Sequence, residues 1–136
     1  MKPMIFINLP VKDLKKAMNF YGNIGFTNNP QFTDHTAACM VLSDEIYVMV
    51  LTHEKFKSFT PKQISDATQT TEVLNSLALG SREEVNSMCD RAIKAGAGEV
   101  SPVMDQGFMF QRNFSDPDGH IWEVLWMDPS FVKKNQ

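Results

Sequence analysis

The pattern of apolar and polar residues predicts a strand followed by a helix near the start of the chain. Alternation over Met4 to Val11 indicates a strand with Phe6 and Asn8 on one face. Asp13 then stands where a helix N-cap belongs. Behind it come apolar residues at helical spacing and a glycine suited to the end of a helix: Leu14, Ala17, Met18, Tyr21 and Gly25.

Two more strands are expected before residue 53. Thr36 to Leu42 and Ile46 to Thr52 are rich in apolar residues, with a turn at 43–45 between them. The second run is almost continuously apolar, which suggests a strand covered on both faces. Residues 53–73 are polar and long for a simple connection, so this stretch is either a functional lid or a linker.

The second half repeats this order. Leu74 to Leu79 reads as a strand, and Ser81 with Glu84 forms a capping box before a helical apolar stripe that ends near Gly96. Two strands follow, Phe108 to Phe114 and His120 to Trp126, joined by an Asp-Pro-Asp-Gly turn. A repeat of about 70 residues is too long for a solenoid unit and indicates a duplicated module. Each module alone would expose one sheet face, so we expect the two sheets to pair around a cleft.

Composition narrows the function classes. A chain of 136 residues fits one domain, divided here into module one (1–52), a linker or lid (53–73), module two (74–128) and a polar tail (129–136). A net charge of −3 without a basic stripe argues against nucleic acid, and no apolar run is long enough to span a membrane. Cys39 and Cys89 are expected to be reduced, buried thiols of a cytoplasmic protein.

Glu123 is the most informative residue, because it is expected to be buried in an apolar strand, Ile-Trp-Glu-Val-Leu. Burying a carboxylate is costly unless it has a partner. One interpretation is structural, with Glu123 bonded to Asn8, Ser76 or a backbone group. The other places it at the floor of a ligand cavity, where it binds a polar group or acts as a general base. No Arg or Lys is expected at an inward strand position, and Arg112, which flanks the cavity strand, is the one cation to test as an oxyanion partner.

Two motifs carry a resemblance to a known family. Leu9-Pro10-Val11-Lys12-Asp13-Leu14, with Asn19-Phe20-Tyr21 and Gly25-Phe26, stands at the front, and Asp116-Pro117-Asp118-Gly119-His120-Ile121-Trp122-Glu123-Val124 at the back. The sequence resembles the vicinal oxygen chelate superfamily, which includes glyoxalase I, bleomycin-resistance proteins and extradiol dioxygenases. Among its subgroups the chain is most similar to bacterial proteins labelled predicted lactoylglutathione lyase. The resemblance implies an α+β fold of two tandem βαβββ modules forming a cupped sheet with a central cavity, often in a homodimer.

Enzymatic members of this superfamily hold a divalent metal on inward-facing residues, and most of those positions differ here. The first-strand ligand falls at Phe6, and the fourth-strand ligand at Val48 or Val50. The histidine that opens the second module falls at Ser76, with Asn75 one residue away, so only Glu123 is kept. A transition-metal site needs about three protein ligands.

The histidines offer little to complete a metal site. We expect His35 and His120 in solvated loops or turns, while His53 opens the polar stretch and could reach the cavity. A metal completed across a dimer interface also stays open as an alternative.

The resulting hypothesis is a binding protein for a small, partly apolar molecule, without a metal. Its ligand contacts would be Phe6, Asn8, Val48, Val50, Ser76, Arg112 and Glu123. The alternative is a glyoxalase-like lyase or isomerase in which Glu123 is catalytic and a divalent metal (Zn, Ni, Mn or Fe) is completed by other residues or by the dimer partner. Both versions expect a cytoplasmic homodimer with a small-molecule ligand, no nucleic acid and no membrane.

Overall fold

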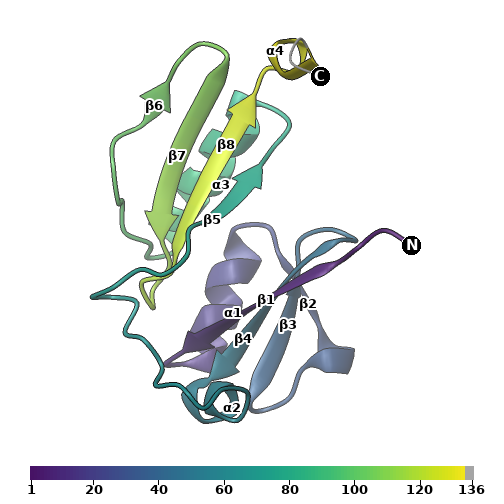
Figure 1. Ribbon diagram of the computed structural model, residues 1–136, viewed down its shortest axis with the longest axis vertical. Coiled ribbons are helices and arrows are strands. Elements are labelled where there is room, and N and C mark those ends of the chain that lie inside the picture. The colour runs from purple at the N-terminus through teal and green to yellow at the C-terminus, as the bar shows by residue number, and fades with distance from the viewer. Residues whose placement is uncertain (134–136) are drawn as a thin grey trace. The chain divides into compact units, whose positions relative to one another are not determined.

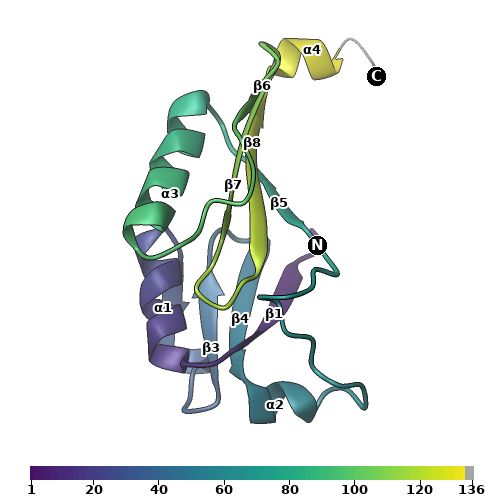
Figure 2. The same cartoon turned by 90° about the vertical axis from the view of Figure 1, so that its left-hand side faces the viewer.

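The computed structural model describes residues 1–133 and divides into two compact units, Met1–Thr70 and Thr71–Gln136. Each unit is a four-stranded mixed sheet with one main helix on one of its faces (Figures 1 and 2). The α+β fold with two tandem βαβββ modules is therefore confirmed.

The first unit begins with β1 and the helix that follows it. Its elements are β1 (Ile5–Val11), α1 (Leu14–Asn23), β2 (Thr27–Asn29), a 3-10 turn η1 (Pro30–Phe32), β3 (Ala37–Val41), β4 (Ile46–Thr52) and α2 (His53–Lys57). The strand order is β1-β4-β3-β2, with β1 parallel to β4 and the other pairs antiparallel.

The second unit repeats this topology. Its elements are β5 (Asn75–Ala78), α3 (Arg82–Lys94), β6 (Met104–Asp105), β7 (Met109–Ser115), β8 (Ile121–Met127) and α4 (Pro129–Lys133). The order β5-β8-β7-β6 matches that of the first sheet strand for strand, and β5 is again parallel to β8. The duplication expected from the sequence is thus present in the sheets.

Both main helices begin and end where the sequence predicts. The side chain of Asp13 accepts a hydrogen bond from the Lys16 backbone N–H (3.1 Å), and Ser81 accepts one from Glu84 N–H (3.1 Å). Each satisfies a backbone donor that the first helical turn cannot pair internally. Gly25 and Gly96 follow the helices with φ of 116° and 106°, values that side chains with a Cβ rarely adopt.

The core lies between each helix and the strands it contacts. In the first unit α1 contacts β3 and β4, and in the second α3 contacts β7 and β8. The buried side chains on these elements include Ala17, Phe20, Tyr21, Met40, Val48 and Val50 in the first unit and Val85, Met88, Ala92, Phe114, Trp122 and Val124 in the second. Removing this apolar surface from water supplies the main favourable term for folding each unit.

Both cysteines are free and buried, as expected from the sequence. Burial raises the pKa of the Cys89 thiol to about 11 and also raises the pKa of Cys39. Thiols protonated in this way pack as small apolar groups and are poor nucleophiles.

Two short helices lie in the stretches that were expected to be a linker or lid and a polar tail. The polar stretch after β4 opens with α2, whose first turn is capped by the Thr52 hydroxyl (3.2 Å from Lys55 N), and α2 contacts β1 and β4. The segment expected as a polar tail begins with α4, where Phe131 stacks on Phe108 at 4.1 Å between ring centroids. Positions 134–136 of that tail lie outside the described residues. No helix within residues 1–133 combines the length and the apolar character that crossing a bilayer requires.

Candidate functional site

The turn between β7 and β8 sets which residues face each other across this hairpin. Asp116 is buried, and its Oδ1 accepts hydrogen bonds from the backbone N–H groups of Asp118 and His120, both at 2.9 Å. Gly119 closes the turn with φ of 96°. This fixed turn pairs Asn113 with Glu123 in the antiparallel ladder.

Three polar residues form a row across neighbouring strands of the second sheet. Ser76 on β5 pairs with Glu123 on β8, which pairs with Asn113 on β7. Paired residues point to the same side of a sheet, so all three side chains lie on the face opposite α3. Ser76 Oγ donates to Glu123 Oε1 at 2.7 Å. We call Ser76, Glu123 and Asn113 the polar row.

Sequence reasoning named two members of this row and missed the third. Asn113 accepts a hydrogen bond from Ser101 N–H (2.9 Å) and donates one to Ser101 Oγ (2.5 Å), so the loop before β6 is tied to the row. The signal was in the sequence: a hairpin centred on Asp118 places Asn113 opposite Glu123.

An apolar patch adjoins the polar row on the same sheet face. Leu125 and Met127 continue β8 beyond Glu123, and Met109 pairs with Met127. Met104 on β6 pairs with Gln111, which pairs in turn with Leu125. We call these four apolar side chains the methionine patch: Met104, Met109, Leu125 and Met127. They are half-buried or exposed, and thioethers adapt readily to ligands of different shape.

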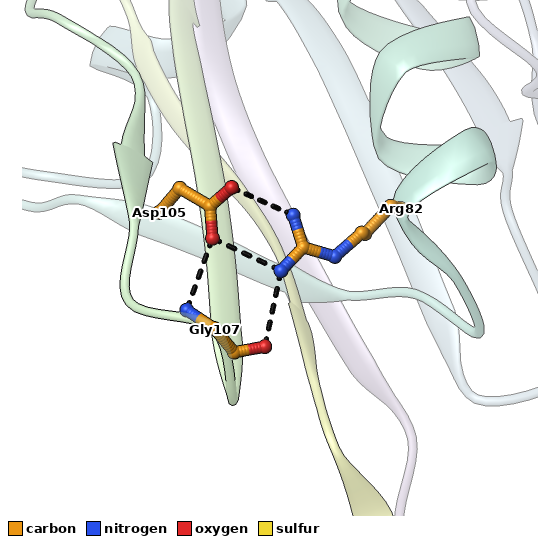
Figure 3. A network of polar contacts seen from close by, with 3 residues as sticks. All are labelled: Arg82, Asp105 and Gly107. Carbon is orange, nitrogen blue, oxygen red and sulfur yellow. Dashed lines mark hydrogen bonds and ion pairs between the residues drawn. The ribbon is translucent and has the colours of Figure 1, made fainter.

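The edge strand that carries Met104 is held by an ion pair on the other side of the sheet (Figure 3). Arg82 Nη1 and Nη2 donate to Asp105 Oδ2 (2.8 Å) and Oδ1 (2.9 Å), and Nη2 also donates to the Gly107 carbonyl (3.0 Å). The guanidinium lies over the rings of Phe110 and Trp126, 5.1 and 5.3 Å from their centroids. The hydrogen bonds from Arg82 lower the pKa of Asp105 to about 2. Nothing in the sequence pattern pointed to this pair.

Glu123 is half-buried, and the expectation of a fully buried carboxylate is wrong. Its neighbours Trp122 and Val124 are the buried residues, because alternation along β8 turns them toward α3. Among the described residues, the Ser76 hydroxyl donates a hydrogen bond to the Glu123 carboxylate, and no cation forms an ion pair with Glu123. The carboxylate therefore keeps acceptor capacity on the open face.

Arg112 does not assist Glu123, which corrects the prediction of an oxyanion partner. It pairs with Val124 and so points to the opposite face from Glu123. There its Nη1 donates to Asn86 Oδ1 (2.9 Å) and Asp90 Oδ1 (2.8 Å) on α3. Arg112 therefore links α3 to the sheet, on the face opposite Glu123.

Val48 and Val50 are also misplaced by the sequence reasoning. Both are fully buried on the face of the first sheet that α1 covers. The opposite face carries Tyr47 and Met49, whose partners on β1 are Phe6 and Asn8. The turn at 43–45 fixes which residues of β4 face α1 and which face away. Because both faces of β4 are apolar, the sequence alone does not distinguish them.

Phe6 and Asn8 do share one face, as predicted, and both are exposed. The Phe6 ring stacks on that of Tyr47, with centroids 4.4 Å apart and ring planes 9° from parallel. Met49 comes two residues after Tyr47, which forms the strand pair nearest the hairpin turn. Glu123 comes two residues after Ile121, which holds the same place in the second unit. Where the second unit has a carboxylate, the first therefore has a thioether.

The donors on these faces do not suit a resident divalent metal. Within residues 1–133, no three His, Cys, Asp or Glu side chains are grouped closely enough to hold an ion. His35 and His53 are exposed in a loop and at the start of α2, and His120 belongs to the turn before β8. One carboxylate beside a serine falls short of the three protein ligands that a transition metal needs.

The duplicated βαβββ topology, with a polar row on the open face of one sheet, defines a glyoxalase-type protein. The chain belongs to the Glyoxalase/Bleomycin resistance protein/Dioxygenase superfamily, whose family description matches residues 4–124. The resemblance to the vicinal oxygen chelate superfamily is thereby confirmed. Comparison with curated protein sequences gave no match.

Solved structures share the fold over nearly the whole chain. A hypothetical protein, SA1046 from S. aureus, is 26% identical with a TM-score of 0.76, and the match covers 93% of this chain and 95% of that one. A glyoxalase/bleomycin resistance protein/dioxygenase family enzyme from Burkholderia phytofirmans has 15% identity and a TM-score of 0.75, covering 93% and 99%. The fosfomycin resistance protein FosX from Mesorhizobium loti has 10% identity and a TM-score of 0.70, covering 98% of both chains. At the two lower identities the likeness concerns the fold alone.

Proposed function

We propose that this chain binds a small, partly apolar molecule on the open face of its second sheet, without a resident metal. The observation that carries the proposal is the polar row lying directly beside the methionine patch on a face that α3 leaves uncovered. Ligand sites in proteins combine apolar lining with a few converging polar groups. Glu123 and Ser76 would orient the ligand, and the patch would contribute most of the contact area.

Residues at the superfamily's ligand positions support binding without a metal. Phe6 offers a ring where enzymatic relatives are expected to offer a histidine, and Met49 stands opposite Asn8 in the same sheet. Aromatic and thioether groups favour apolar ligand surface, whereas hard or borderline divalent ions favour carboxylate and imidazole. The same residues count against the lyase or isomerase alternative, which needs a metal or strong donors to stabilise an enediolate.

Titration with a neutral apolar dye, N-phenyl-1-naphthylamine, tests the binding face. Leu125→Glu places a charge in the methionine patch, whereas Ile93→Glu makes the same kind of change on the exposed side of α3. We expect Leu125→Glu to weaken dye binding by about tenfold or more, because covering the charge is costly, and Ile93→Glu to leave it unchanged. Circular dichroism checks that both variants fold. Equal binding by the two variants would show that the ligand lies elsewhere.

Metal analysis of protein purified without an affinity tag tests the alternative. The proposal expects substoichiometric Zn, Ni, Mn and Fe in the wild type. A stoichiometric divalent ion that disappears in Glu123→Gln would instead favour the lyase or isomerase, with a metal completed by residues beyond the polar row.

A further inference from the structure

The strands of the second sheet, β5 to β8, place one charged side chain on the open face. The residues that β5 to β8 present there are otherwise neutral: Ser76, Ala78, Met104, Met109, Gln111, Asn113, Ser115, Ile121, Leu125 and Met127. Glu123 is thus the single charged side chain that these four strands place on this face. A ligand lying on the methionine patch would meet a carboxylate at its edge.

No cation described in the second unit forms an ion pair with Glu123. Arg112 and Arg82 both lie on the α3 side of the sheet, where Asp90 and Asp105 already pair with them. The amide of Asn113 is engaged by Ser101, and the Ser76 hydroxyl supplies one hydrogen bond to one carboxylate oxygen. An ionised carboxylate accepts about four hydrogen bonds, so most of its capacity is met by water.

A ligand that covers the methionine patch would remove part of that water. An anionic group, or one without a hydrogen-bond donor, would leave Glu123 short of partners in a drier site, at a cost that offsets the apolar contact. A neutral donor would supply a hydrogen bond but no opposite charge. A cationic donor would replace the lost water with a charge-assisted hydrogen bond. We propose that the ligand of this face is a cationic amphiphile, with a protonated amine at Glu123 and an apolar body over the methionine patch. This inference rests on the proposed binding function and adds the chemical class of the ligand.

Two fluorescent probes that differ in one charge test the inference. Dansylcadaverine carries a protonated primary amine on an apolar dye, and its N-acetyl derivative is neutral. At about 0.15 M salt, which screens long-range attraction, wild-type protein should bind the amine about tenfold more tightly, the lower range for a hydrogen bond to a charged group. Glu123→Gln should reduce this preference to within about twofold. Glu83→Gln, the same change at an exposed site on α3, should retain it.

The outcomes separate the two proposals. If both probes bind the wild type equally, the cationic class is wrong, and if the preference for the amine survives in Glu123→Gln, the amine does not bind at Glu123. Either result overturns the inference, while binding at the methionine patch still stands. An equal loss of preference in Glu83→Gln would show that net charge alone attracts the amine, and this too overturns the inference. If neither probe binds the wild type, the binding function and the ligand class both fail.

Discussion

Ser76 and Glu123 are 47 residues apart in sequence, and the Ser76 hydroxyl lies 2.7 Å from Oε1 of Glu123. The parallel pairing of β5 with β8 brings them together, and that pairing depends on α3 forming the crossover between the two halves of the sheet. The bond holds Oε1 in place, and no other described residue forms a hydrogen bond or ion pair with this carboxylate. Ser76 is therefore a positioning residue for Glu123.

Replacing Ser76 with alanine should cost little stability. The bond lies on an exposed face, so we expect a loss of about 0.5–1 kcal/mol in the free energy of unfolding, measured in urea. A double-mutant cycle with Glu123→Ala, which removes the acceptor, should recover most of this loss as coupling between the two residues. Ser65→Ala, in an exposed loop, provides the neutral control. A coupling energy near zero would show that the bond does not persist in solution.

Local signals in the sequence predicted the fold well, and strand faces less well. The caps at Asp13 and Ser81 and the turn at Asp116 are short-range devices whose residues reveal their conformation. Which face a strand residue takes depends on turn length and pairing, and a shift of one residue reverses it. That is why Val48 was placed on the open face, although Ser76 was among the partners considered for Glu123.

Arg112 is a second residue whose strand face was not recognised from the sequence. Counting from the Asp-Pro-Asp-Gly turn would have paired Asn113 with Glu123 and sent Arg112 to the helix side. Its partners Asn86 and Asp90 lie on α3, and no local pattern links them to β7. The Arg82–Asp105 pair is equally non-local, so sequence reasoning had no signal for it.

Substitutions in β4 test the corrected faces of the first sheet. Val48→Ala should lower the free energy of unfolding by about 2 kcal/mol, because it opens a cavity in a fully buried core. Met49→Ala, one residue along on the half-buried opposite face, should cost roughly 1 kcal/mol or less. Urea unfolding measures both. A larger cost for Met49→Ala than for Val48→Ala would mean that the faces are assigned the wrong way round.

The Arg82–Asp105 pair should make stability depend on pH in the acid range. Arg82 lowers the pKa of Asp105 from 3.8 to about 2 in the folded protein, so the ionised form stabilises the fold. This contribution is complete above the unfolded pKa of 3.8 and is lost as the pH falls through the folded value of about 2. Asp105→Asn should therefore be less stable than the wild type at about pH 6, and the gap should close between about pH 4 and pH 2.

Urea midpoints across that pH range measure the gap. Asp44→Asn, a charge change in the exposed turn before β4, serves as the control and should show no comparable closing. If the difference between Asp105→Asn and the wild type is the same at both ends of the range, the ion pair does not set the low pKa of Asp105.

Arg112→Met separates a structural arginine from a ligand contact. The substitution keeps an apolar stem and removes the hydrogen bonds to Asn86 and Asp90, so we expect a loss of about 1–2 kcal/mol in the free energy of unfolding. A larger loss is not expected, because the Asp90 side chain is 71% exposed and water can replace its partner. The preference for dansylcadaverine over its N-acetyl derivative should stay within about twofold of the wild-type value, since Arg112 points away from Glu123. A change in that preference without a loss of stability would place Arg112 at the ligand after all.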